Sequence, residues 1–68
     1  MNENEVKEAL VGKAFIQYKG AATYQLLGVG KGKLDDGSWF KGAAYLGEDN
    51  VYYVRPYHMF QDFERVSV

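Results

Sequence analysis

The stretch that decides the fold is Val51-Tyr52-Tyr53-Val54-Arg55-Pro56-Tyr57-His58-Met59-Phe60. Its first half is rich in β-formers, and the chain's single proline then removes a backbone donor, which predicts that a strand ends at or just after Arg55. The residue before a proline prefers extended geometry, so Arg55 stays in the strand. Proline can open a helical turn, and Tyr57 and Phe60 then fall on one side of it. The stretch therefore predicts a strand, a single helical turn and a closing strand over residues 61–66.

Three further strands are predicted before this stretch, because apolar and polar residues alternate in short segments that turn residues separate. Ile16 and Tyr18 fall on one face of the first segment, and Phe15 falls on the other. The pair Asp36-Gly37 is a strong hairpin signal between the second and third segments. The three strands are expected at residues 13–18, 23–29 and 38–46.

A short helix is predicted before the strands. Asn2 and Glu5 have the spacing of a capping box, and apolar residues recur at helical spacing after them. We expect a helix over residues 4–10 that ends at Gly12. Two interpretations stay open for it: it covers one end of the core, or it serves self-association.

These segments together predict an all-β fold, namely a small five-stranded SH3-like barrel with a short N-terminal α-helix and a single helical turn before the last strand. Residues 1–68 are expected to form a single domain, with the helix at 4–10 and the barrel at 13–67. Met59 and Phe60 are expected to be buried. Four Phe, six Tyr and one Trp are more than one minimal core absorbs, so some should face a ligand or a second subunit.

Glycines crowd the run Gly28-Val29-Gly30-Lys31-Gly32-Lys33. It does not fit a P-loop, because Leu27 and Leu34 stand where a glycine and a Ser or Thr are required. The dinucleotide fingerprint fails as well, since Lys33 takes the third glycine position and no helix follows. Two interpretations remain: a plain flexible loop, or an anion-binding concavity of glycine amides beside Lys31 and Lys33.

Composition excludes several classes of protein. There is no cysteine, hence no disulfide framework and no thiolate metal site, which fits a reducing compartment. The first residues lack the apolar core of a signal peptide and no segment resembles a membrane span, so a cytoplasmic location without membrane contact is expected. A net charge of -1 argues against broad binding to a phosphate backbone but leaves a local basic patch open.

The sequence predicts no catalytic site. Thr23, Ser38, Ser67 and His58 lie in no recognisable nucleophile context, and a metal site would have to rest on His58 without paired ligand spacing. The adjacent acidic pairs fit solvated turns better than a calcium loop. We therefore expect a protein that is not an enzyme and has no metal or cofactor.

Several short pieces of the chain together resemble a known family. They are Tyr18-Lys19-Gly20, Tyr24, Leu27-Gly28-Val29, and Val54-Arg55-Pro56 followed by Met59-Phe60. In this combination the chain resembles the small bacterial and phage family called domain of unknown function 1653, over residues 15–64. The resemblance implies a compact β-barrel and supplies no activity and no catalytic residues. It also implies a phage-like setting.

A candidate binding site follows from the focal stretch. If Tyr53 and Arg55 share one face of the strand, a stacking ring lies beside a cation suited to carboxylate or phosphate. The alternative is that Arg55 pairs with Asp62 or Glu64, while the neighbouring aromatic and histidine side chains have structural roles. The complete set of candidate ligand-binding residues is Arg55, His58, Tyr53, Tyr57, Trp39, Lys31 and Lys33.

The predicted function is a non-catalytic binding module, expected to be a homo-oligomer, that captures a small anionic or nucleotide-like ligand through a cluster of aromatic, arginine and histidine side chains and sequesters it. One alternative is an SH3-like protein or peptide interaction module with an aromatic groove formed by Tyr52, Trp39 and Tyr57. The other is single-stranded nucleic-acid binding by stacking. Eight basic residues among nine acidic ones make nucleic acid the weaker alternative.

Overall fold

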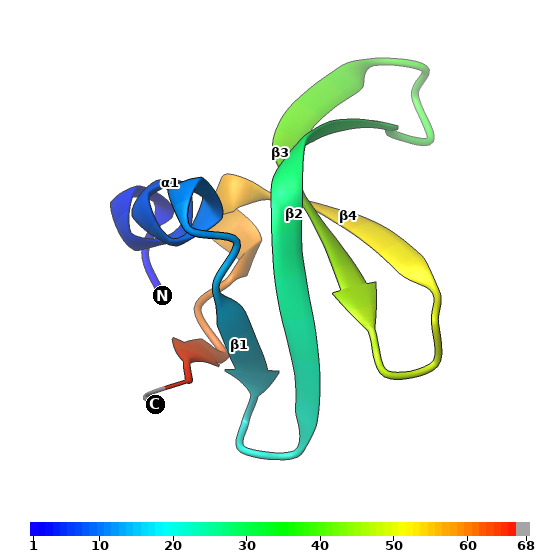
Figure 1. Ribbon diagram of the computed structural model, residues 1–68. Coiled ribbons are helices and arrows are strands. Elements are labelled where there is room, and N and C mark those ends of the chain that lie inside the picture. The colour runs from blue at the N-terminus through cyan, green and yellow to red at the C-terminus, as the bar shows by residue number, and fades with distance from the viewer. Residues whose placement is uncertain (67–68) are drawn as a thin grey trace.

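The computed structural model describes residues 1–66, which form one α-helix, a short 3₁₀ helix and a five-stranded antiparallel sheet (Figure 1). This confirms the predicted number of strands, the N-terminal helix and the helical turn before the last strand. The predicted end of the barrel at residue 67, and Ser67 itself, lie outside the described residues. The elements are α1 (Glu3–Val11), β1 (Phe15–Tyr18), β2 (Ala22–Lys33), β3 (Trp39–Gly47), β4 (Tyr52–Pro56), the 3₁₀ helix η1 (Tyr57–Met59) and β5 (Phe63–Arg65).

The strand order in the sheet is β4-β3-β2-β1-β5, and every neighbouring pair is antiparallel. Four strands follow one another as a meander, and η1 then returns the chain so that β5 pairs with β1. No pairing joins β4 to β5 within residues 1–66, so the sheet has two edges and the closed barrel is not confirmed.

The helix forms where the capping box predicts it. Asn2 Oδ1 accepts from the Glu5 amide at 2.9 Å, and the Asn2 amide donates to Glu5 Oε1 at 2.8 Å. Val6 and Ala9 are fully buried against the sheet, which confirms that α1 covers the core. Its exposed face carries most of its charged side chains.

The glycine run 28–33 is strand, so the expected flexible loop is wrong. β2 continues to Lys33, and its glycines pair with β3. The turn at the tip explains this: Gly37 has φ 89°, its amide donates to Leu34 O, and the Leu34 amide donates to Ser38 O at 2.8 Å. This closed turn holds both strands in register up to the tip. A register shift between Leu26 and Gly28 marks a β-bulge in β2 at the start of this run.

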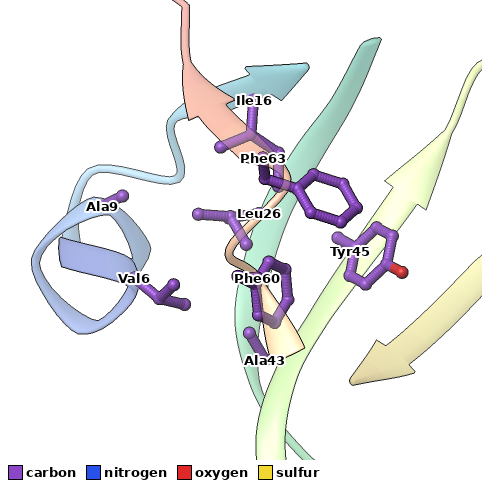
Figure 2. Close-up of a cluster of buried hydrophobic side chains, with 8 residues drawn as sticks. All are labelled: Val6, Ala9, Ile16, Leu26, Ala43, Tyr45, Phe60 and Phe63. Atoms are coloured by element: carbon purple, nitrogen blue, oxygen red, sulfur yellow. The ribbon is translucent and has the colours of Figure 1, made fainter. Parts of the chain in front are cut away.

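The core lies between α1, the sheet and the segment from η1 to β5 (Figure 2). The rings of Tyr45, Phe60 and Phe63 meet with centroids 5.1 to 5.9 Å apart in tilted and edge-on arrangements, which aromatic pairs prefer. The buried residues are Val6, Ala9, Ile16, Leu26, Ala43, Tyr45, Phe60 and Phe63.

Met59 and Phe60 are both expected to be buried, and the structure confirms this for Phe60 but not for Met59. Phe60 is fully buried, whereas Met59 is 46% exposed. In a 3₁₀ turn residues three apart share a side, so Tyr57 and Phe60 both face the core while Met59 points away.

At Gly42 the backbone of β4 leaves no room for a side chain on β3. This residue lies opposite Pro56, and a Cβ atom on it would overlap the backbone carbonyl of Arg55. Only glycine allows this approach, because a backbone group cannot rotate out of the way as a side chain can.

We expect Phe60→Ala to lower the free energy of unfolding by about 3–5 kcal/mol through loss of a buried ring. Met59→Ala should cost less than about 1 kcal/mol because that side chain is half exposed. Urea denaturation followed by circular dichroism measures both, and Phe60→Leu gives a milder value if the alanine variant does not fold. Equal losses for positions 59 and 60 would contradict the described core.

Gly42→Ala should destabilise the protein by about 2 kcal/mol or more, because β3 and β4 must separate to admit the methyl group. Gly28→Ala is the matched control, since a Cβ atom there meets nothing within 4 Å. The same urea titration distinguishes them, and equal tolerance at both positions would refute the close approach.

Candidate functional site

The seven predicted ligand-binding residues fall into two groups, which together involve four elements of the structure. Tyr53, Arg55, Tyr57 and His58 belong to β4 and η1, and we call them the β4–η1 group. Lys31 and Lys33 lie on β2 and Trp39 lies on β3, in the long hairpin that these strands form. The two sets have different surroundings and are described in turn.

Arg55 is held by groups of the protein itself. Its Nε donates to the Tyr45 hydroxyl at 3.0 Å, and its Nη1 donates to the Met59 carbonyl at 3.3 Å. Its Cζ lies 5.3 Å from the centroid of the Phe63 ring, within cation–π range. These contacts fasten η1 and β5 to the end of β4, and they use two of the five guanidinium donors.

The alternative pairing of Arg55 with Asp62 or Glu64 is not formed among residues 1–66. Asp62 instead lies 4.0 Å from Lys19 Nζ, with both side chains 61% exposed. Such an exposed, long ion pair contributes little to stability. Arg55 is therefore positioned by hydrogen bonds and a ring, and not by a carboxylate.

The other members of the β4–η1 group are differently exposed. Tyr53 is half-buried and its hydroxyl donates to Asp49 Oδ2 at 2.7 Å. The half-buried Tyr57 packs against the core, with Lys7 Nζ 5.0 Å from its ring centroid. His58 is exposed on η1. Two of these side chains thus serve the core and the β3–β4 turn, and His58 faces solvent.

The carboxylate of Asp49 organises the turn between β3 and β4. Besides the Tyr53 hydroxyl, it accepts from the Val51 amide at 3.1 Å. These two hydrogen bonds lower the pKa of Asp49 below its ordinary value of 3.8, and the bond to Asp49 raises the pKa of Tyr53 above 10.0. Asp49 is thus a turn anchor.

The second set forms a basic face, which we call the lysine hairpin and define as Lys31, Lys33, Trp39 and Lys41. Lys31 lies directly opposite Lys41, and Lys33 lies directly opposite Trp39. Because side chains alternate along a strand, all four project from one face of the sheet. Lys33 Nζ lies 5.6 Å from the centroid of the Trp39 ring, which is 65% exposed.

None of these three lysines has an ion pair in the part of the chain that the structure describes. Lys41 was missed by the sequence interpretation, although it follows Trp39 by two residues in a strand and the alternation could have found it. Its pairing with Lys31 depends on register, which no local pattern gives. The alternative interpretation of the glycine run as a concavity of amides does not match the structure, because Gly28, Gly30 and Gly32 lie in a strand that pairs with β3.

A hollow of about 190 Å³ lies where β1, β2 and the end of β3 meet. Glu48 Oε1 accepts from the Thr23 amide at 3.0 Å at its rim. None of the seven predicted ligand-binding residues lines this hollow. The hollow forms where the strand register brings Phe15 beside Gln25 and Gln25 beside Leu46, and the sequence of one strand does not indicate that register. The hollow is lined by Phe15, Thr23, Tyr24, Gln25, Leu46, Gly47 and Glu48.

No family model, curated protein or solved structure matches this chain. Within residues 1–66, no helix is long and apolar enough to cross a membrane. The same residues contain no group of three or more His, Asp or Glu side chains placed to hold a metal ion. The candidate site therefore rests on the geometry described above.

We expect Asp49→Asn to flatten the acid dependence of stability. The pKa of Asp49 is lower in the folded protein than in the unfolded chain, so its ionised carboxylate stabilises the fold at any pH above the unfolded-state pKa. This stabilisation is lost as the pH falls through the folded-state pKa. Urea titrations between about pH 5 and pH 2 should show the wild type losing more stability than the variant. Identical slopes would rule out the anchoring role of Asp49.

Proposed function

We propose that this protein is a non-catalytic binding module that captures a small anionic or nucleotide-like ligand on the lysine hairpin. The observation that carries the proposal is the pair of Lys31 and Lys41, directly opposite each other beside the exposed ring of Trp39. No enzymatic step is needed for such a protein to act, since binding alone sequesters the ligand.

The electrostatic repulsion between Lys31 and Lys41 supports this role, because a bound anion would relieve it. Like charges directly opposite each other on neighbouring strands destabilise a sheet. Lys31 and Lys41 are in this position, and no carboxylate among residues 1–66 neutralises them. An anion placed between the two ammonium groups removes the repulsion and gains two charge-assisted hydrogen bonds.

Trp39 supports a ligand with a flat ring over a simple inorganic ion. Its ring is 65% exposed, and Lys33 lies at one side of it. Stacking of a base on an aromatic side chain contributes about 1–3 kcal/mol. A phosphate on the Lys31–Lys41 pair and a base on Trp39 together describe a nucleotide-like ligand.

Two residues of the β4–η1 group, Arg55 and His58, extend the proposed site beyond the lysine hairpin. Arg55 lies opposite Ala43, two residues from Lys41 along β3, and alternation puts Arg55 on the same face of the sheet. Its remaining guanidinium donors extend the positive face towards η1, where His58 is exposed. We include both residues in the proposed site as secondary contacts.

We also propose that the sheet belongs to an SH3-like barrel of the family called domain of unknown function 1653. The strand order, with β5 beside β1 and η1 between β4 and β5, supports this architecture. The motif residues Val54-Arg55-Pro56 and Met59-Phe60 lie at that junction. In the phage-like setting that the resemblance implies, the module would sequester a signal of the host.

Titration with adenosine diphosphate, followed by the fluorescence of the single tryptophan, tests the proposed site. Saturable quenching of Trp39 is expected, with a Kd that rises as salt is added. Lys31→Glu should raise the Kd at least tenfold while keeping or increasing stability, because the new pair with Lys41 is attractive. Lys13→Glu, at an exposed position before β1, makes the same change of charge and is the control that should bind as the wild type does.

Two results would overturn the proposal. The first is no saturable response to the nucleotide in the wild type, and the second is binding that survives Lys31→Glu unchanged. A response only to an oligothymidylate, with steep salt dependence, would instead assign the hairpin to single-stranded nucleic acid.

A further inference from the structure

The outer edge of β4 has no partner strand within residues 1–66. We propose that this edge pairs with β4 of a second copy of the chain, which gives a dimer with two-fold symmetry and a continuous sheet across the interface. The proposal concerns the backbone edge of β4 and not the side chains of the lysine hairpin, so either proposal can hold without the other.

The ladder between β3 and β4 determines which backbone groups face outward. The Gly47 amide donates to Val51 O at 3.0 Å, so this pair is hydrogen-bonded. Bonded and non-bonded pairs alternate in an antiparallel ladder, and Tyr53 therefore bonds to β3 whereas Tyr52 and Val54 do not. The N–H and C=O groups of Tyr52 and Val54 point away from β3 and need another strand or water.

The other edge of the sheet is protected, and the β4 edge is not. β5 has only three residues, two of them charged, and the Met1 ammonium group occupies the Phe63 carbonyl at 2.8 Å. Short length, charge and a covering segment are the usual devices that block an edge. β4 instead presents Tyr52, which is 71% exposed, and Val54, which is 38% exposed.

The sequence of this edge matches itself in antiparallel orientation. With Tyr53 on the two-fold axis, Tyr52 lies opposite Val54 of the partner subunit, and the outward backbone groups of both copies bond to one another. The charged residues of the segment 49–55 are Asp49 and Arg55. Antiparallel pairing sets the arginine end of one copy beside the aspartate end of the other, and it sets no like charges opposite each other.

The size of the contact sets the expected affinity. A stable interface buries about 800 Å² per partner, and an edge of a few residues buries less. A net charge of -1 per chain adds little long-range repulsion between copies. The dimer should therefore be weak and reversible, and it should be visible only at high protein concentration.

Hydrogen exchange by NMR, measured over a range of protein concentrations, tests the pairing directly. The amides of Tyr52 and Val54 should gain at least tenfold protection as concentration rises, while the Tyr53 amide, already bonded to β3, should change little. Sedimentation equilibrium reports the dimer itself. Val54→Lys places a charge at the centre of the interface and should weaken dimerisation at least tenfold, whereas Val11→Lys, at an 89% exposed site on α1, should not.

Three outcomes would overturn the proposal. One is a monomer at about 1 mM protein. Another is a dimer whose dissociation constant changes equally in Val54→Lys and Val11→Lys. If Val54→Lys does not fold, Tyr52→Lys serves as the edge variant in this comparison. The third is a monomer whose Tyr52 and Val54 amides gain protection only when an extended peptide is added, which would assign the edge to a peptide ligand.

Discussion

The contact between Phe60 and Phe63, with ring centroids 5.1 Å apart, is the interaction on which the rest of this small fold depends. These rings lie between α1 and the sheet, and the Met1 ammonium group donates to the carbonyls of both residues at 3.0 and 2.8 Å. Met1 and the segment that carries Phe60 and Phe63 are thereby fixed to one core. A meander of β-strands without such a cover has one apolar face open to water and is only marginally stable.

Because this core is compact, it does not absorb all the aromatic side chains. Tyr45, Phe60 and Phe63 are buried, whereas Phe15, Tyr52 and Trp39 are at least half exposed. The exposed rings are distributed over separate surfaces of the sheet: Trp39 beside the lysines of the hairpin, Tyr52 on the free edge of β4, and Phe15 at the hollow. The surplus of aromatic residues that the composition indicates is therefore peripheral.

Local sequence patterns predicted which helices and strands exist. They did not predict which residues lie opposite each other on neighbouring strands, because that depends on long-range register. The capping box, the proline after Arg55 and the alternation of apolar residues indicated the helix, the strand end and the strand faces correctly. The glycine run reads locally as a loop, yet cross-strand pairing with β3 makes it strand up to Lys33. The role of Lys41 and the hollow near Phe15 also depend on which residues lie opposite each other, and one strand alone does not specify that.

The overall charge of the chain is a poor guide to its surface, because many of its carboxylates are engaged locally. Glu5 caps α1, Asp36 bonds to Ser38 in the hairpin turn, and Asp49 bonds to Tyr53. These carboxylates accept hydrogen bonds at the helix end and in the turns, and among residues 1–66 none of them forms an ion pair with the lysines of the hairpin. A net charge of -1 therefore coexists with a positive face. The relevant electrostatic quantity for ligand binding here is the local field of a few facing lysines, which acts over about 10 Å at moderate salt.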